Sequence, residues 1–258
     1  MPPLEVIREL AQNTIKIHDL DTPVIRADIE LTTPYLPRVY CAILRTVVLN
    51  ALHLTLDAIY IDVGPGKCDC ALHVATVLED MLSIPIYKTK NEDTTPFETP
   101  ICKSKMNLLQ KLEHITEGVK TVEKLPSPPA PCTPTAGFWG VPPRDFSILD
   151  LFPDTTHIYG WTRCMENKTP ADHELELHYN PEIPTVFYAQ SFCAKTALAR
   201  HLADKHPHGL YLDSDVTAEA MLAYLEGMIL LAKAENDPEV IYRLGPALKT
   251  IRIEMNPH

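Results

Sequence analysis

The sequence is poor in glycine and has no excess of basic residues. It contains nine glycines and 24 prolines among 258 residues, which indicates many turns but few backbone positions that require a positive φ. With 23 Lys and Arg against 34 Asp and Glu, the formal charge is −11. A protein that binds nucleic acid or an anionic membrane by charge neutralisation would carry a basic face. The composition therefore disfavours both kinds of partner.

Long uninterrupted apolar runs are also missing. The longest apolar stretch, residues 39–61, is broken by Arg45, Asn50, His53 and Asp57, whereas a membrane-spanning helix needs about 20 apolar residues in a row. The first ten residues, MPPLEVIREL, lack the charge and the apolar run of a signal peptide. We therefore expect a cytoplasmic protein whose seven cysteines are reduced rather than paired in disulfides.

Several well-known catalytic and metal-binding motifs are absent from the sequence. There is no CxxC, no HExxH and no GxSxG. The turn Gly64-Pro65-Gly66-Lys67 follows an apparent strand, but a phosphate-binding P-loop has four residues between its glycines and Ser or Thr after the lysine, where this chain has Cys68. Gly64, Gly66 and Lys67 could still bind an anionic cofactor group through backbone N–H groups. A plain tight turn is the alternative.

Strand-like and helix-like segments alternate through both halves of the chain. Residues 57–63 (DAIYIDV) and 84–88 (IPIYK) are typical of buried strands on either side of an amphipathic helix, and 184–189 (PTVFYA) and 209–213 (GLYLD) repeat the pattern. This alternation predicts an α/β fold with two Rossmann-like or flavodoxin-like subdomains, whose mostly parallel sheets surround a cleft. Residues 125–134 contain five prolines. We accordingly expect subdomains at 1–125 and 137–258, joined by a proline-rich linker at 126–136.

Four cysteines follow predicted strands, at the edge where parallel sheets bind their ligands. These are Cys68, Cys70, Cys164 and Cys193. A thiol near a helix N-terminus is favoured as thiolate, and iron–sulfur clusters need thiolates from separate segments. We predict that these four bind a metal, most plausibly as an iron–sulfur cluster of the [4Fe-4S] type, with Cys102 as the alternative fourth ligand.

The two remaining cysteines, Cys41 and Cys132, are not expected to bind the metal. Cys41 is predicted to lie in the core of a helix over residues 37–52, and Cys132 belongs to the linker. Burial of an unreactive thiol is the competing explanation for each cysteine, because free cysteine is among the most buried residue types.

This layout is similar in plan to iron–sulfur enzymes of the nitrogenase-component, 2-hydroxyacyl-CoA dehydratase and quinolinate-synthase kinds, which hold a cluster between α/β subdomains; no residue role is taken from them. The predicted function is an iron–sulfur-dependent reductase-type enzyme, or a component of a cofactor-building or electron-transfer system. Trp139 would support a planar ligand, and Arg144 and Glu166 would act with Cys193 on the substrate. A small molecule or a redox protein is the expected partner, and homo-oligomerisation is left open.

Two other functions are compatible with the sequence. Residues 185–213 resemble the opening of a glutaredoxin-like domain, in which CAKT would be a one-cysteine active site, and this resemblance implies thiol exchange at Cys193. The chain could instead be a non-enzymatic α/β module that binds a ligand or a larger subunit.

Overall fold

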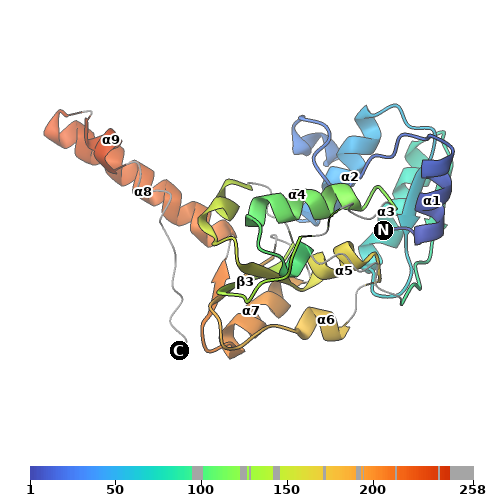
Figure 1. Cartoon of the computed structure of the whole chain (residues 1–258). Helices are drawn as coiled ribbons and strands as arrows, with labels where there is room; N and C mark the ends of the chain where they lie inside the picture. The colour runs from blue at the N-terminus through green and yellow to red at the C-terminus, as the bar shows by residue number, and fades with distance from the viewer. Residues whose placement is uncertain are drawn as a thin grey trace.

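The computed structural model has a mixed α/β architecture with two parallel sheets (Figure 1). It describes residues 1–94, 101–122, 127, 129–141, 146–170, 173–189, 193, 195–212, 214–237 and 239–244. The α/β class and the parallel pairing predicted from the sequence are confirmed. No helix in these ranges is both long enough and apolar enough to span a membrane.

The first sheet has two strands and lies in the N-terminal part of the chain. Strand β1 pairs in parallel with β2, with Ile59 opposite Ile86, and helix α3 connects them as the predicted βαβ unit. Helices α2 and α3 bury Val48, Val74 and Leu78 against this sheet. The elements of this part are α1 (Leu4–Gln12), η1 (Ile29–Thr32), α2 (Ala42–His53), β1 (Ile59–Asp62), α3 (Asp69–Met81) and β2 (Ile86–Thr89).

The second sheet has four parallel strands in the order β4-β3-β5-β6. Because successive side chains of a strand point to opposite faces, each face of this sheet is covered by its own helices. The elements of this part are η2 (Ile101–Lys103), α4 (Leu108–Gly118), β3 (Ala136–Gly140), η3 (Phe146–Leu151), β4 (Thr156–Tyr159), α5 (Trp161–Asn167), α6 (His173–Leu177), β5 (Thr185–Tyr188), α7 (Lys195–Lys205) and β6 (Gly209–Leu212).

Adjacent residues of β3 separate the two cores of the second sheet. Phe138 packs with Leu108 and Leu112 of α4, whereas Trp139 packs with Ala199 of α7 on the other face. Figure 1 shows α4 and α7 on opposite sides of β3. Helix α4, which falls within the expected N-terminal subdomain 1–125, thus contributes its apolar face to the core of the second sheet.

In the second sheet, the side on which successive strands are added reverses between β3 and β5. The chain passes from β3 to β4 on one side and then crosses to β5 on the other, and crevices for ligands form at such switch points. Gly140 ends β3 here with φ +134°, and a Cβ on it would lie 1.9 Å from the Tyr188 carbonyl oxygen. Only glycine allows the two strand ends to approach this closely. Cys193 lies five residues after the end of β5.

A helical hairpin ends the described chain. Helix α8 (Ser214–Glu235) projects away from the sheets, and α9 (Glu239–Leu244) folds back against it (Figure 1).

The structure corrects three local predictions. The glycines and prolines of residues 137–143 are typical of a loop, but this segment contains most of β3, and the alternating residues 172–178 (DHELELH) are typical of an exposed strand, but this segment contains α6. Helix α2 begins at Ala42 rather than near Pro37, so Cys41 precedes it instead of lying in its core. Of the predicted linker 126–136, Pro126 and Pro128 lie outside the described residues, and the Cys132 N–H donates to the Lys103 carbonyl over 2.9 Å.

Candidate functional site

Three cysteines from distant segments occupy the starts of three helices. Cys41 is the N-cap of α2, Cys68 is the N-cap of α3, and Cys193 lies two residues before α7. The first two come from the N-terminal part and the third from the switch point of the second sheet. None of the three is fully buried. Each of these three accessible thiols therefore lies at or near the positive end of a helix dipole.

The Cys41 and Cys193 thiols lie close enough to influence each other's protonation. This interaction lowers the pKa of Cys41 to about 6, and it raises the pKa of Cys193, because one proton shared between two sulfurs leaves one of them as thiolate. The N–H groups of Ile43 and Leu44 face Cys41 and lower its pKa further, although neither forms a capping hydrogen bond. The Lys195 N–H lowers the pKa of Cys193 in the same way.

Cys68 completes the group. Burial raises the pKa of its thiol, the Cys70 N–H opposes that rise, and the negative charge of Cys41 adds to it. Cys70 lies beside Cys68 and near the Tyr40 hydroxyl, and burial together with the interaction with Cys70 raises the pKa of Tyr40 to about 12. Tyr40 thus remains a neutral phenol beside the thiols. We call Cys41, Cys68 and Cys193 the thiol group.

Two lysines next to the thiol group lie against one aromatic ring. The ammonium nitrogens of Lys67 and Lys195 are 5.1 Å and 4.9 Å from the centre of the Trp161 ring, distances typical of cation–π contacts. Lys67 precedes Cys68 in the sequence, and Lys195 is two residues after Cys193. Trp161, at the start of α5, thereby links the loop after β1 to the loop after β5. We call these three residues the cation–π clasp.

The turn after β1 is organised by Asp62, whose side chain is fully buried. Its Oδ1 accepts hydrogen bonds from the N–H groups of Gly64, at 3.0 Å, and of Asn91, at 2.9 Å, and its Oδ2 lies 3.2 Å from the Lys67 ammonium. The Gly64 N–H, a predicted anion-binding group, therefore already has an acceptor. Gly66 adopts the left-handed conformation that the tight turn requires, with φ +71°.

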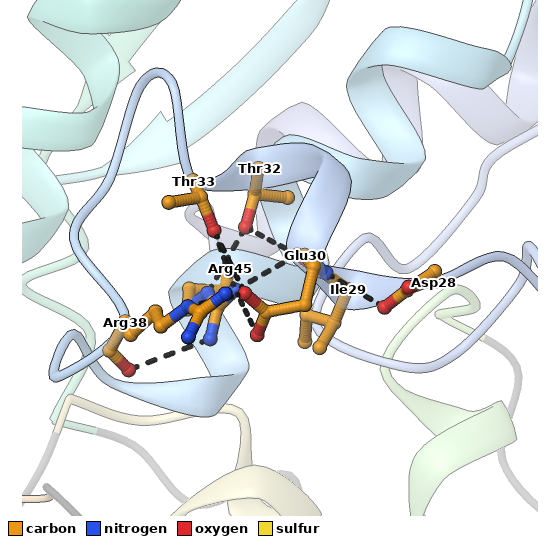
Figure 2. Close-up of polar contacts among 7 residues, drawn as sticks. All are labelled: Asp28, Ile29, Glu30, Thr32, Thr33, Arg38 and Arg45. Carbon is orange, nitrogen blue, oxygen red and sulfur yellow. Dashed lines mark hydrogen bonds and ion pairs between the residues drawn. The ribbon is translucent and has the colours of Figure 1, made fainter.

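A buried arginine fixes the segment that leads into Cys41 (Figure 2). The Arg45 side chain donates from Nε to the Thr32 hydroxyl at 3.0 Å, and from Nη2 to the Ile29 carbonyl at 2.9 Å. It also reaches the Arg38 carbonyl at 3.4 Å and Glu30 Oε1 at 3.2 Å. Arg45 lies one helical turn after Cys41, whose carbonyl accepts the Arg45 backbone N–H at 3.0 Å. The same residue thus holds both the first turn of α2 and the loop before it.

The remaining predicted thiols lie inside the second sheet's core. Cys164 is buried within α5, and Cys102 is buried in η2, where burial and the nearby Glu166 carboxylate raise the pKa of its thiol well above the usual range. Glu166 accepts the Ile101 N–H at 2.5 Å and the Cys102 N–H at 3.2 Å, and burial raises the pKa of its carboxyl group. These hydrogen bonds hold the Glu166 carboxylate against the backbone of η2.

Trp139, the predicted support for a planar ligand, lies within the second sheet rather than at the thiol group. Trp139 is 1% exposed in the centre of β3, and its indole N–H donates to the Glu176 carbonyl at 2.6 Å. Arg144 lies outside the described residues.

Sequence reasoning missed Cys41, Tyr40 and Asp62. Cys41 follows no strand, so a rule based on strand ends could not select it. The available signal was local: Pro34 and Pro37 interrupt the chain just before the apolar helical run that begins at Ala42, which makes Cys41 a possible N-cap.

Among the described residues, no three His, Cys, Asp or Glu side chains are close enough to hold one metal ion. No family model, no curated protein and no solved structure matches this chain.

Proposed function

We propose that the protein holds an iron–sulfur cluster through Cys41, Cys68 and Cys193, and that it is a reductase-type enzyme or a component of a cofactor-building or electron-transfer system. The observation that carries the proposal is the convergence of three thiols from three helix N-termini. In this proposal the two sheets with their helices act as two subdomains, and the cluster lies between them. Cys41 replaces Cys164 of the set expected from the sequence.

The chemistry of the donor set, three thiols, is what favours an iron–sulfur cluster. The ligands of one tetrahedral metal ion lie roughly 4 Å apart, as metal–sulfur bonds of about 2.3 Å require, whereas cluster ligands are about 6–7 Å apart. Among the described residues no three such side chains form a single-ion site, and the interacting Cys41 and Cys193 thiols would have to separate to reach the wider spacing of cluster ligands. Soft thiolates are also the ligands that iron–sulfur clusters use.

The surroundings would stabilise the negative charge of ligated thiolates. N–H groups at the starts of α2, α3 and α7 face the sulfurs, and such contacts tune cluster potentials. Lys67 and Lys195 add two positive charges on the same side. When bound, a cluster with three protein thiolates supplies electron transfer and leaves one iron able to act as a Lewis acid. Cys70 is the alternative fourth ligand.

The test is anaerobic purification followed by iron and sulfide analysis and an absorbance spectrum. We expect Cys41→Ser, Cys68→Ser and Cys193→Ser each to lose most of the bound iron. Cys132→Ser, a half-buried thiol outside the group, should retain it, and so should Cys164→Ser. A wild-type protein that contains no iron after reconstitution, or a Cys41→Ser variant that keeps all of it, overturns the proposal.

A second candidate function, thiol–disulfide exchange, is favoured by the contact between Cys41 and Cys193. The thiolate of one residue would attack a disulfide of low-molecular-weight thiols, which releases one thiol, and the other residue would displace the second thiol and close an intramolecular disulfide. Metal-free protein treated with glutathione disulfide should then lose two hydrogens in mass at this pair. A stable glutathione adduct on Cys193, with no Cys41–Cys193 disulfide, would reject this candidate.

A further inference from the structure

The hairpin formed by α8 and α9 buries only one face of its longer helix. Met228 and Ala232 of α8 pack towards Val240 of α9, and all three are buried. The Tyr224 hydroxyl donates to the Leu244 carbonyl at 3.1 Å and fixes the hairpin at its other end. Since the hairpin projects away from the two sheets (Figure 1), the opposite face of α8 is not covered by them.

That opposite face carries a narrow apolar stripe. At 100° per residue, Ala223, Gly227, Leu230 and Ala234 align on the side of α8 that faces away from α9, and all four are exposed. Their spacing of four, three and four residues is that of a coiled-coil seam. Leu230 is 67% exposed, and the space around the Cα of Gly227 is open. A seam of this kind favours a second helix.

Charged residues along one edge of the stripe select the orientation of that helix. Glu226 and Lys233 lie seven residues apart on the same edge, and both are exposed. In a copy of α8 packed in parallel, the edge with Glu226 and Lys233 would face the partner's other edge, which carries Tyr224 and Leu231, and no opposite charges would meet. An antiparallel copy, related by a twofold axis near residue 229, instead places Glu226 opposite the partner's Lys233, and the same ion pair forms a second time by symmetry.

We propose that α8 mediates a homodimer by antiparallel packing against the α8 helix of a second copy of this chain. Leu230 inserts beside the partner's Gly227, where the missing side chain leaves room for it. The stripe from Ala223 to Ala234 extends over about 16 Å of helix, enough for three turns of contact. With α9 of each copy on the outer side, the two hairpins form a four-helix arrangement.

The first test is the solution mass at tens of micromolar, measured by sedimentation or light scattering on the full-length protein. We expect twice the chain mass of 28.9 kDa for the wild type and the single-chain mass for Leu230→Glu. Leu151→Glu is the matched control, because Leu151 is 52% exposed on η3, outside the hairpin. Unchanged circular dichroism spectra would show that both variants fold.

A charge-exchange experiment identifies the occupant as a second copy. Glu226→Lys creates two like-charge contacts with the partner's Lys233, and Lys233→Glu creates two with the partner's Glu226, so each variant alone should dimerise at least about tenfold more weakly. Mixing the two variants restores both opposite-charge pairs and should restore the dimer. A monomeric wild type, a dimeric Leu230→Glu variant, or a mixture that dimerises no better than its components overturns the proposal.

Discussion

Replacing Arg45 by Met should destabilise the protein and disturb the position of Cys41. The side chain of Arg45 is 8% exposed and makes two short hydrogen bonds, to the Thr32 hydroxyl at 3.0 Å and to the Ile29 carbonyl at 2.9 Å. Methionine has a similar length but no donor. A buried acceptor that loses a charged donor costs about 1.5 kcal/mol, so the two together cost about 3 kcal/mol. With a urea dependence of about 3 kcal/mol per molar, the unfolding midpoint should fall by about 1 M.

The local consequence of this substitution separates a positioning role from a general loss of stability. Arg45 holds η1 and the Arg38 carbonyl against the first turn of α2 (Figure 2), so its loss should release the loop that ends at Cys41. We therefore expect Arg45→Met to bind less iron than the wild type at temperatures at which both are folded. In metal-free protein, the substitution should also change the alkylation rate of the Cys41 thiol more than that of the Cys132 thiol.

The control is Arg38→Met. The Arg38 guanidinium is 75% exposed and pairs with Glu30 at 2.6 Å, and exposed pairs contribute little to stability. This variant removes a cation next to the same Glu30 carboxylate but keeps the Arg38 carbonyl that Arg45 contacts. If Arg45→Met unfolds at the same urea concentration as Arg38→Met, or retains wild-type iron and Cys41 reactivity, the reasoning is refuted.

Three further predictions concern other contacts. Trp161→Leu should lower iron retention while Trp161→Phe preserves most of it, because phenylalanine keeps an aromatic face for the two lysines of the clasp; equal loss in both variants would contradict this. Gly140→Ala should prevent stable folding, since its Cβ would meet the Tyr188 carbonyl at 1.9 Å, whereas Gly118→Ala meets nothing within 4 Å and should unfold at the wild-type midpoint. Burial lowers the pKa of Lys168 to about 8, so below pH 8 this lysine is charged in both states, and above it the folded state releases its proton first. The stability of the wild type relative to Lys168→Met should therefore rise between about pH 8 and pH 10.5, and a pH-independent difference in urea midpoints would argue against the buried lysine as its source.

The strands were predictable where apolar runs were continuous, and β3 was missed because its sequence is unusual for a strand. Runs such as DAIYIDV and PTVFYA mark β1 and β5, and in β5 the neighbouring Phe187 and Tyr188 face the two different cores of the second sheet. Strand β3 (AGFWG) contains two glycines and follows a proline-rich stretch, features typical of a loop. In the folded protein those glycines are packing requirements, because a Cβ on Gly137 would lie 2.4 Å from the Thr185 hydroxyl. A residue pattern that lowers local strand propensity is thus the pattern that lets β3 lie at the centre of its sheet.

The thiols show why the position of a cysteine relative to a helix start is more informative than its position relative to a strand. Cys164 was selected because it follows β4 closely, but Gly160 caps α5 immediately, with φ +73°, and places Cys164 one turn inside the helix, where it is 1% exposed. Cys41 was passed over because it follows no strand, yet it caps α2 and lies beside Cys193. A thiol at an N-cap has free N–H groups directed towards it and remains at the end of the element, whereas one turn further on it turns into the helix packing. The strand-end rule selects Cys68 and Cys164 alike, and the N-cap position is what distinguishes Cys68 and Cys41 from Cys164 in the structure.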